Sequence, residues 1–330
     1  MLFRSCLVII LMSGMVPQSL ARDPVDSKSP GRICIVVGAA GESEYGERFA
    51  SWARALDNSL GEITRKKIGF IEGAALETLP QESDRKQLAD WISETEKVES
   101  GEERWIIFFG HGTHDGKSSK MNLRGEDVSA SELRDLLAKS THRWVIVICS
   151  ACSAPFLNEL SGADRIVITA TKSANESNFS RFGESFSSAF SDLEADLDHD
   201  GAISLLEAFL VSSRKTERYY AEKRLLATEH AMIDDNGDKK GTGAEFYNGL
   251  RIARRSEGGE LDGMRAGQLW LIPPRNRLDL TQKAMERVEE LEAQVRSIRG
   301  DKKGMTEDEY YRKLEILLTE IAHLLYAGKE

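Results

Sequence analysis

The sequence predicts an α/β fold with a mostly parallel central sheet, followed by a C-terminal α-helical hairpin. Short continuous runs of Val, Ile and Phe recur between residues 22 and 275, and stretches with helical periodicity separate them. Apolar strands that alternate with helices are typical of a parallel sheet covered on both faces. The chain has 330 residues, of which 41% are hydrophobic, and this is enough for one large core or two modest ones.

The N-terminus has the pattern of a cleavable secretory signal over residues 1–21. Arg4 precedes an apolar stretch at Leu7–Met12, and small residues end the segment at Ser19 and Ala21. The apolar stretch is shorter than the ~20 residues that a membrane-spanning helix needs. We therefore expect a secreted or periplasmic protein without a membrane span.

Strands and helices are expected to alternate along the body of the chain. The strand Ile33–Val37 ends in the turn Gly38–Gly41 and precedes a helical pattern at Tyr45–Leu60. The same unit recurs, with strands expected at Lys67–Ile71, Trp105–Phe109, Trp144–Cys149 and Arg165–Ala170, and helices at Asp84–Ser93 and Ser131–Leu137. In such sheets, active residues gather at the carboxyl ends of the strands.

Residues 276–330 are expected to form an antiparallel helical hairpin after a boundary at Pro273–Pro274. Apolar residues recur at spacings of three and four in two groups: Met285, Val288, Leu291, Val295 and Ile298, then Tyr310, Leu314, Leu317, Ile321 and Leu324. Each arm has few heptads, which favours a hairpin that supports the body over a partner-binding coiled coil.

Two of the expected strands lead into residues that can carry chemistry. His111 follows the strand Trp105–Phe109 after one glycine, and Cys152 follows the strand Trp144–Cys149 after a Ser-Ala pair. If these strands are neighbours in a parallel sheet, both residues emerge at the same edge. A thiol needs a nearby imidazole to act as a nucleophile, and the Gly112 amide is free to face an oxyanion. The pattern thus predicts a catalytic His–Cys pair.

Other cysteine and histidine residues have ordinary structural interpretations. Cys149 lies where strand alternation still buries it, and Cys34 lies inside another strand, so we interpret both as core thiols. His114 is interpreted as a solvent-exposed turn residue, with substrate contact as the alternative.

The sequence resembles the caspase-like cysteine peptidases, and within them the bacterial relatives of the legumain (asparaginyl endopeptidase) family. The motifs are His111-Gly112 after one apolar strand and Ala151-Cys152 after the next, in the order and spacing of that group. Residues Arg165–Ser173 and Thr228–His230 also resemble the bacterial branch, and the similarity extends from about Ile33 to Tyr247. The resemblance implies a caspase-like three-layer fold over residues 22–275.

By this resemblance, Cys152 is the nucleophile, His111 the general acid, and the amides of Gly112 and Cys152 the oxyanion donors. Two departures stand out. Legumains have Glu before Ala-Cys where this chain has Ser150, and they have an Asn that helps to orient the histidine in the loop corresponding to Gly38–Gly41. The selectivity of legumains for asparagine is therefore not carried over.

Residues 196–207 fit the EF-hand calcium loop, with acids at the first, third and fifth places, Gly201 at the sixth and Glu at the twelfth. The predicted ligands are Asp196, Asp198, Asp200, the Ala202 carbonyl, Ser204 and Glu207. Helices are expected at Phe182–Leu193 and Leu205–Tyr220. A single loop favours a structural calcium ion. The alternative is an acidic helix cap without a metal. Asp234–Asp238 is interpreted first as a loop and second as a metal contributor, because it lacks the final Glu.

These features favour an exported cysteine endopeptidase that acts on peptides or proteins through an acyl-enzyme. One alternative is a catalytically inactive caspase-like scaffold or interaction module that binds calcium, and another is a cysteine hydrolase of small amides or esters. The net charge of −10, with cations scattered among acids, offers no cationic surface for nucleic acid. The pattern leaves the oligomeric state open.

Overall fold

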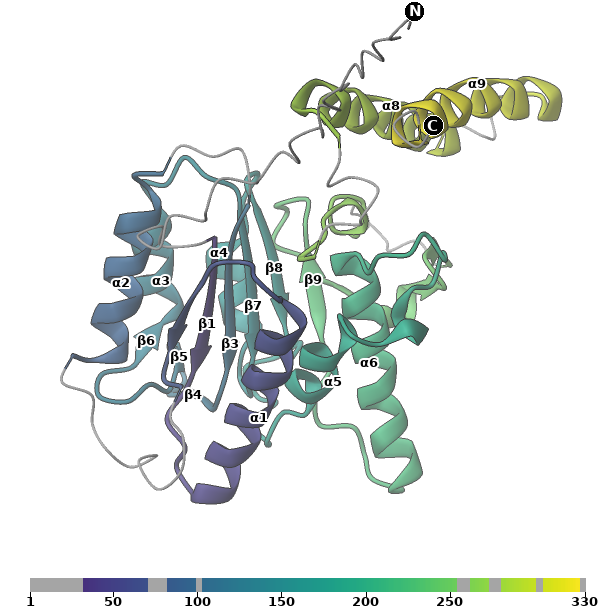
Figure 1. Cartoon of the computed structure of the whole chain (residues 1–330). Coiled ribbons are helices and arrows are strands. Elements are labelled where there is room, and N and C mark those ends of the chain that lie inside the picture. The colour runs from purple at the N-terminus through teal and green to yellow at the C-terminus, as the bar shows by residue number, and fades with distance from the viewer. Residues whose placement is uncertain are drawn as a thin grey trace, which may run out of the picture.

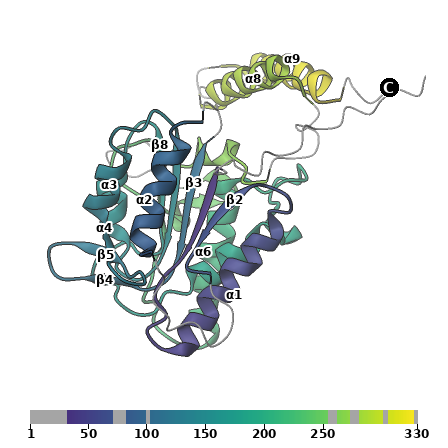
Figure 2. The same cartoon turned by 60° about the vertical axis from the view of Figure 1, so that its left-hand side comes forward.

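The structure is a computed structural model that describes residues 32–70, 82–98, 103–253, 262–272, 280–300 and 305–326. The predicted signal segment 1–21 and the predicted boundary Pro273–Pro274 lie outside the described residues. A seven-stranded sheet forms the centre of the body, with helices packed on both of its faces (Figures 1 and 2).

The strand order in this sheet is β10-β9-β8-β7-β3-β1-β2. The parallel strands are β1 (Ile33–Val37), β2 (Arg65–Ile68), β3 (Arg104–Phe109), β7 (Trp144–Cys149) and β8 (Arg165–Thr169). At one edge β9 (Met232–Asp234) and β10 (Thr242–Gly243) continue the sheet antiparallel. Because β2 and β3 lie on opposite sides of β1, the winding direction reverses at β1 and β3, where ligand sites form in such sheets.

Helices in the described part of the chain cover both faces of the sheet. One face carries α1 (Ser43–Ser59), α5 (Phe182–Ala189) and α6 (Leu205–Glu222). The other carries α2 (Asp84–Thr95), α3 (Ala130–Leu137) and α4 (Ala154–Leu160). The expected α/β class, with a mostly parallel sheet between helical layers, is confirmed.

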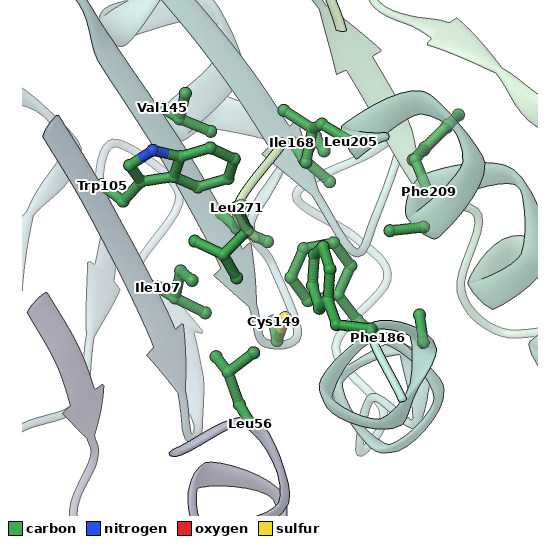
Figure 3. Packing of buried hydrophobic residues seen from close by; sticks show 14 of the residues in the cluster. Leu56, Trp105, Ile107, Val145, Cys149, Ile168, Phe186, Leu205, Phe209 and Leu271 are labelled. Atoms are coloured by element: carbon green, nitrogen blue, oxygen red, sulfur yellow. The ribbon is translucent and has the colours of Figure 1, made fainter. Parts of the chain in front are cut away.

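Alternate residues of the central strands enter two separate cores. Ile107 and Val147 pack with α1, α5 and α6. Figure 3 shows Ile107 in this cluster. Their neighbours Ile106 and Ile146 pack with α2, α3 and α4. Strands buried on both faces need apolar residues at every position, which explains the continuous Val, Ile and Phe runs in the sequence.

Some predicted boundaries differ from the observed ones. Strand β2 begins at Arg65 rather than Lys67, because an edge strand tolerates exposed charged side chains and Arg65 pairs with Asp57. The predicted helix Phe182–Leu193 ends at Ala189, and a short 3-10 turn follows at Leu193–Ala195.

Several short strands were not expected from the sequence. They are β9 and β10 of the main sheet, and β4 (Gly112–His114), β5 (Ser119–Met121), β6 (Val128–Ser129), β11 (Tyr247–Asn248) and β12 (Arg251–Ile252). Strands of two or three residues are too short for a detectable hydrophobic period.

The C-terminal segment forms the expected hairpin of α8 (Gln282–Gly300) and α9 (Glu307–Tyr326). The two helices share an apolar core that includes Val288, Leu291, Leu314 and Leu317. The Met285 side chain, which was predicted to share this face, lies outside the described part of the structure. None of the described helices has both the length and the apolar character needed to cross a bilayer.

Candidate active site

The two predicted catalytic residues follow neighbouring parallel strands. Strands β3 and β7 pair in a register that places Phe109 beside Cys149. His111 follows Phe109 after Gly110, and Cys152 follows Cys149 after Ser150 and Ala151. The sheet therefore delivers both residues to its carboxyl edge, next to the point where the winding reverses.

The loops that carry His111 and Cys152 are in direct contact at Gly112. A Cβ atom on Gly112 would lie 2.2 Å from the Ala151 carbonyl oxygen and 2.7 Å from the Ser150 Oγ. Gly110 is equally confined, since its Cβ would lie 2.5 Å from Cζ of Phe108. Only glycine fits at these positions, and the absence of a side chain at Gly112 brings the two strand ends together.

The His111 ring is half-buried among aromatic side chains. The rings of Tyr45 and Phe49 each meet it edge-on, with centroids 4.9 Å away, and the Phe179 centroid lies 6.2 Å away. Burial lowers the pKa of His111, and a hydrogen bond with the Ala40 backbone and the charge of Glu42 oppose this effect. His111 is therefore a neutral imidazole at neutral pH.

The Ala40 backbone lies close to the His111 ring. Ala40 belongs to the Gly38–Gly41 loop after β1, and its backbone opposes the larger effect of burial on the pKa of His111. Legumains have an asparagine in this loop that helps to orient the histidine, and its absence is the departure noted in the sequence. In this chain the same loop places a backbone group, that of Ala40, beside the histidine.

Cys152 occupies a strained and nearly closed position. Its φ angle is 54°, in the left-handed region that residues with a Cβ rarely adopt, and its exposed fraction is 3%. Burial raises the pKa of its thiol, so the sulfur is protonated in this conformation. Cys152 belongs to neither hydrophobic core of the body, and backbone strain of this kind is common at functional sites.

The predicted oxyanion donors differ in their availability. The Cys152 amide donates to the Glu176 carbonyl oxygen at 2.9 Å, so the prediction that it faces an oxyanion is wrong for this conformation. Gly112 pairs with Met121 in β5, and the Asn122 amide donates to the His111 carbonyl at 3.0 Å. This pattern makes Gly112 and Met121 a non-hydrogen-bonded pair, so the Gly112 amide points away from β5.

Cys149 and Cys34 are core thiols, as predicted. Cys149 lies with Leu56, Ile107 and Phe186 in the core on the α1 side (Figure 3), and Cys34 lies in the core on the opposite side. Burial raises the pKa of both thiols. Neither thiol is available as a nucleophile.

His114 was interpreted as an exposed turn residue, and this is wrong. It lies half-buried in β4, and its Nδ1 is 3.0 Å from the Ser119 Oγ across the β4–β5 pair. The short strands were not visible in the sequence, so the pairing partner of His114 was not either.

Three residues of the predicted calcium loop come together. Carboxylate oxygens of Asp196, Asp198 and Glu207 lie within 4.8 Å of one another. Asp200 stays outside this group, and its Oδ1 accepts the Ala202 amide at 2.8 Å. Burial and the charge of Asp198 raise the pKa of Glu207, which a bound cation would counteract.

The loop also serves as a helix cap. The Ser204 Oγ and its amide both donate to Glu207 Oε2, each at 2.8 Å, which forms a capping box at the start of α6. Gly201 has a φ of 85°, as the sixth place of an EF-hand loop requires. The helix-cap interpretation therefore explains the positions of Ser204 and Glu207. It does not explain Asp196 and Asp198, whose side chains take no part in the cap.

The loop Asp234–Asp238 is organised by hydrogen bonds to its own backbone. Asp234 accepts the amides of Gly237 and Lys239, and Asn236 accepts that of Asp238. Asp235 accepts the amides of Arg265 and Ala266. These contacts agree with the interpretation of this segment as a loop.

Sequence reasoning missed two residues that contact the candidate site, Glu176 and Phe179. Glu176 accepts the Cys152 amide, and Phe179 packs beside His111. Both follow β8 in a polar stretch without hydrophobic periodicity, so no local pattern marked them. Ser150 was noted only as a departure from the legumain motif, and its buried hydroxyl, beside Gly112, has no hydrogen-bond partner among the described residues.

No protein-family profile and no curated protein matches this sequence. Among solved structures, the chain is similar to caspase-1 from Spodoptera frugiperda, with a TM-score of 0.37 and 10% sequence identity. The match covers 66% of this chain and 94% of that caspase.

Proposed function

We propose that this chain is an exported, caspase-like cysteine endopeptidase of the legumain type that uses Cys152 and His111. One observation carries the proposal: neighbouring parallel strands in matched register end two and three residues before a histidine and a left-handed cysteine, respectively. The motifs around His111 and Cys152 support the family assignment. A strained nucleophile on a sharp turn after a strand is a recurring arrangement in hydrolases.

The proposed reaction uses the neutral imidazole of His111 as the first proton acceptor. His111 takes the thiol proton while the Cys152 Sγ attacks the scissile carbonyl carbon, and the Gly112 amide donates to the oxyanion. The imidazolium then protonates the departing amine nitrogen, the C–N bond breaks, and a thioester remains. Water hydrolyses the thioester, which releases the carboxylic acid and returns a proton to the sulfur.

A second candidate is an inactive scaffold of the same fold. In its favour, the Cys152 thiol is buried and protonated, and its amide is occupied by Glu176. A peptidase must open this arrangement before it can react, whereas a scaffold need never do so.

The test is digestion of a peptide library together with labelling by a peptidyl electrophile that reacts with thiols. We expect the unaltered protein to cleave peptides, and Cys152→Ser or His111→Ala to reduce the rate by roughly a thousandfold or more. Cys149→Ala is the matched control, since this buried thiol takes no part. Cleavage that survives Cys152→Ser would reject the proposal, and turnover of small esters without peptide cleavage would favour the other hydrolase class.

We further propose that Asp196, Asp198 and Glu207 bind calcium with a structural role, supported by Asp200, the Ala202 carbonyl and Ser204. Hard oxygen ligands in this spacing suit Ca²⁺. The unaltered protein should melt at a higher temperature in calcium than in chelator, and Asp196→Asn with Asp198→Asn should remove the difference. Those substitutions leave the Ser204–Glu207 cap intact. Equal melting temperatures in calcium and chelator would contradict the proposal.

A further inference from the structure

We infer that the segment Lys172–Ser180, here called the strap, is a closed cover over the candidate nucleophile that is latched by Glu176 and His230. The inference concerns regulation of the proposed active site and rests on that proposed function for its meaning. The contacts that define the strap stand independently of it.

The strap contacts both candidate catalytic residues. The Glu176 carbonyl accepts the Cys152 amide at 2.9 Å, and the thiol beneath is almost fully buried. Three residues further on, the Phe179 ring packs against the rings of His111 and Tyr45, with centroids 6.2 Å and 4.9 Å away. One short segment therefore contacts the cysteine backbone at one point and the histidine ring at another.

The N-terminal end of the strap is anchored to buried groups. Thr171, just before the strap, is fully buried, and its amide donates to the Ser153 Oγ at 3.1 Å. The Ala154 amide in turn donates to the Thr171 Oγ1 at 3.0 Å. These bonds tie the start of the strap to the first turn of α4.

The C-terminal end is anchored to a buried carboxylate. Glu229 accepts the Ser180 hydroxyl at 2.6 Å, the amides of Arg181 and Phe182, and the Tyr220 hydroxyl at 3.0 Å. Ser180 and Glu229 are both buried. Each end of the strap is thus fixed by several hydrogen bonds to buried groups.

The middle of the strap is held by the Glu176 side chain. Its carboxylate accepts the Lys172 amide at 2.9 Å and the His230 amide at 3.3 Å, and it pairs with the His230 ring. His230 is 41% exposed, and Lys172, Asn175, Ser177 and Asn178 are exposed as well. The contact therefore joins an exposed imidazole to a half-buried carboxylate, and water reaches it from the His230 side.

Displacement of the strap would change the chemistry in two ways. It would expose the Cys152 sulfur, which lowers the desolvation that keeps it protonated. It would also release the Cys152 amide, which could then join the Gly112 amide as a second oxyanion donor. The closed strap explains why the candidate site is incomplete in this conformation.

The test measures the rate at which iodoacetamide alkylates Cys152 in the folded protein, with the modified residue located by mass spectrometry. We expect Glu176→Ala and His230→Gln each to raise this rate by about tenfold, because each removes a charge-assisted hydrogen bond that holds the strap closed. Glu184→Ala is the control, since this exposed residue pairs with Arg181 outside the strap.

Unchanged alkylation in both folded variants would overturn the latch. His230 is exposed, so its replacement leaves the buried anchors intact and keeps the test valid if the Glu176 variant does not fold. Iodoacetamide needs only an accessible thiol, so faster alkylation without any peptide cleavage would support the latch and reject the peptidase. Peptide cleavage with unchanged alkylation would support the peptidase and reject the latch.

Discussion

The glycine loops after β1 and β3 and the strap after β8 both contact the candidate catalytic residues, but they are held in place differently. The glycine loops fit by shape: a Cβ on Gly38 would lie 2.6 Å from the Asn122 carbonyl oxygen, and one on Gly112 would meet the Ala151 carbonyl. The strap is held by hydrogen bonds to buried groups at its ends and by Glu176 in its middle. The difference indicates a site with a fixed part, which aligns the strand ends, and a part held mainly by hydrogen bonds, with Phe179 as its contact with the core on the α1 side.

The largest effect is expected from removal of the anchor at the end of the strap. Glu229→Ala leaves the Ser180 hydroxyl and the amides of Arg181 and Phe182 without their acceptor, which should lower the free energy of unfolding by about 3 kcal/mol or more. Urea unfolding measures this change. Glu176→Ala, the matched change in the middle of the strap, removes a half-buried carboxylate that accepts the Lys172 and His230 amides, and it should cost about 1–2 kcal/mol. Equal losses in the two variants would contradict the division of the strap into anchors and latch.

Crowding of the glycine loop is expected to have the next largest effect. The new methyl group of Gly112→Ala would meet the Ala151 carbonyl oxygen at 2.2 Å and force the two strand ends apart. We expect a loss of about 1–3 kcal/mol in unfolding free energy and a loss of peptidase activity. Gly162→Ala is the control, because its Cβ would meet only the Arg165 side chain at 4.0 Å. A folded Gly112→Ala variant with full activity would show that the contact is not needed for alignment.

Removal of the aromatic cover tests the strap at His111. Phe179→Ala should raise the pKa of His111 toward its usual value, because burial is the main cause that lowers it. Because folding lowers the pKa of His111, the unfolded chain binds a proton at this residue before the folded chain does as the pH falls below about 6.5. The free energy of unfolding therefore decreases over this pH range. Phe179→Ala should make this decrease in the free energy of unfolding smaller. NMR titration of the ring measures the pKa, with Leu193→Ala, at a 92% exposed site, as control. An unchanged titration would indicate that Phe179 does not desolvate the histidine.

The smallest effect is expected from relief of backbone strain at Cys152. Glycine adopts a φ of 54° without a steric penalty, so Cys152→Gly should raise the free energy of unfolding by about 1 kcal/mol and abolish peptidase activity. Thermal unfolding of Cys152→Gly is compared with that of Cys152→Ala, which keeps a Cβ atom in the strained conformation. The difference between the two variants measures the effect of the backbone strain. A glycine variant that is no more stable than the alanine variant would mean that the left-handed geometry is not strained here.

The sequence by itself determined the layered architecture and the pair of strand ends. Continuous apolar runs such as Trp144–Cys149 indicate a strand that is buried on both faces. This pattern is local, so it can be recognised in the sequence alone. The same alternation correctly separated the core thiol Cys149 from Cys152, which follows the strand. Short strands such as β4 could not be predicted, because two or three residues are too few to show a hydrophobic period. The environment of His114, which lies in β4, was predicted wrongly for the same reason.

Only the tertiary structure decided how the two catalytic candidates are held. The left-handed turn at Cys152 and the Glu176 carbonyl that accepts its amide are features of the main chain, so they do not depend on residue type. The partners Glu176 and His230 are also 54 positions apart. The pattern of apolar residues in a sequence indicates which residues are buried. It does not indicate which distant carbonyl accepts the hydrogen bond of a given amide. Such contacts arise from the packing of segments that fold together in space.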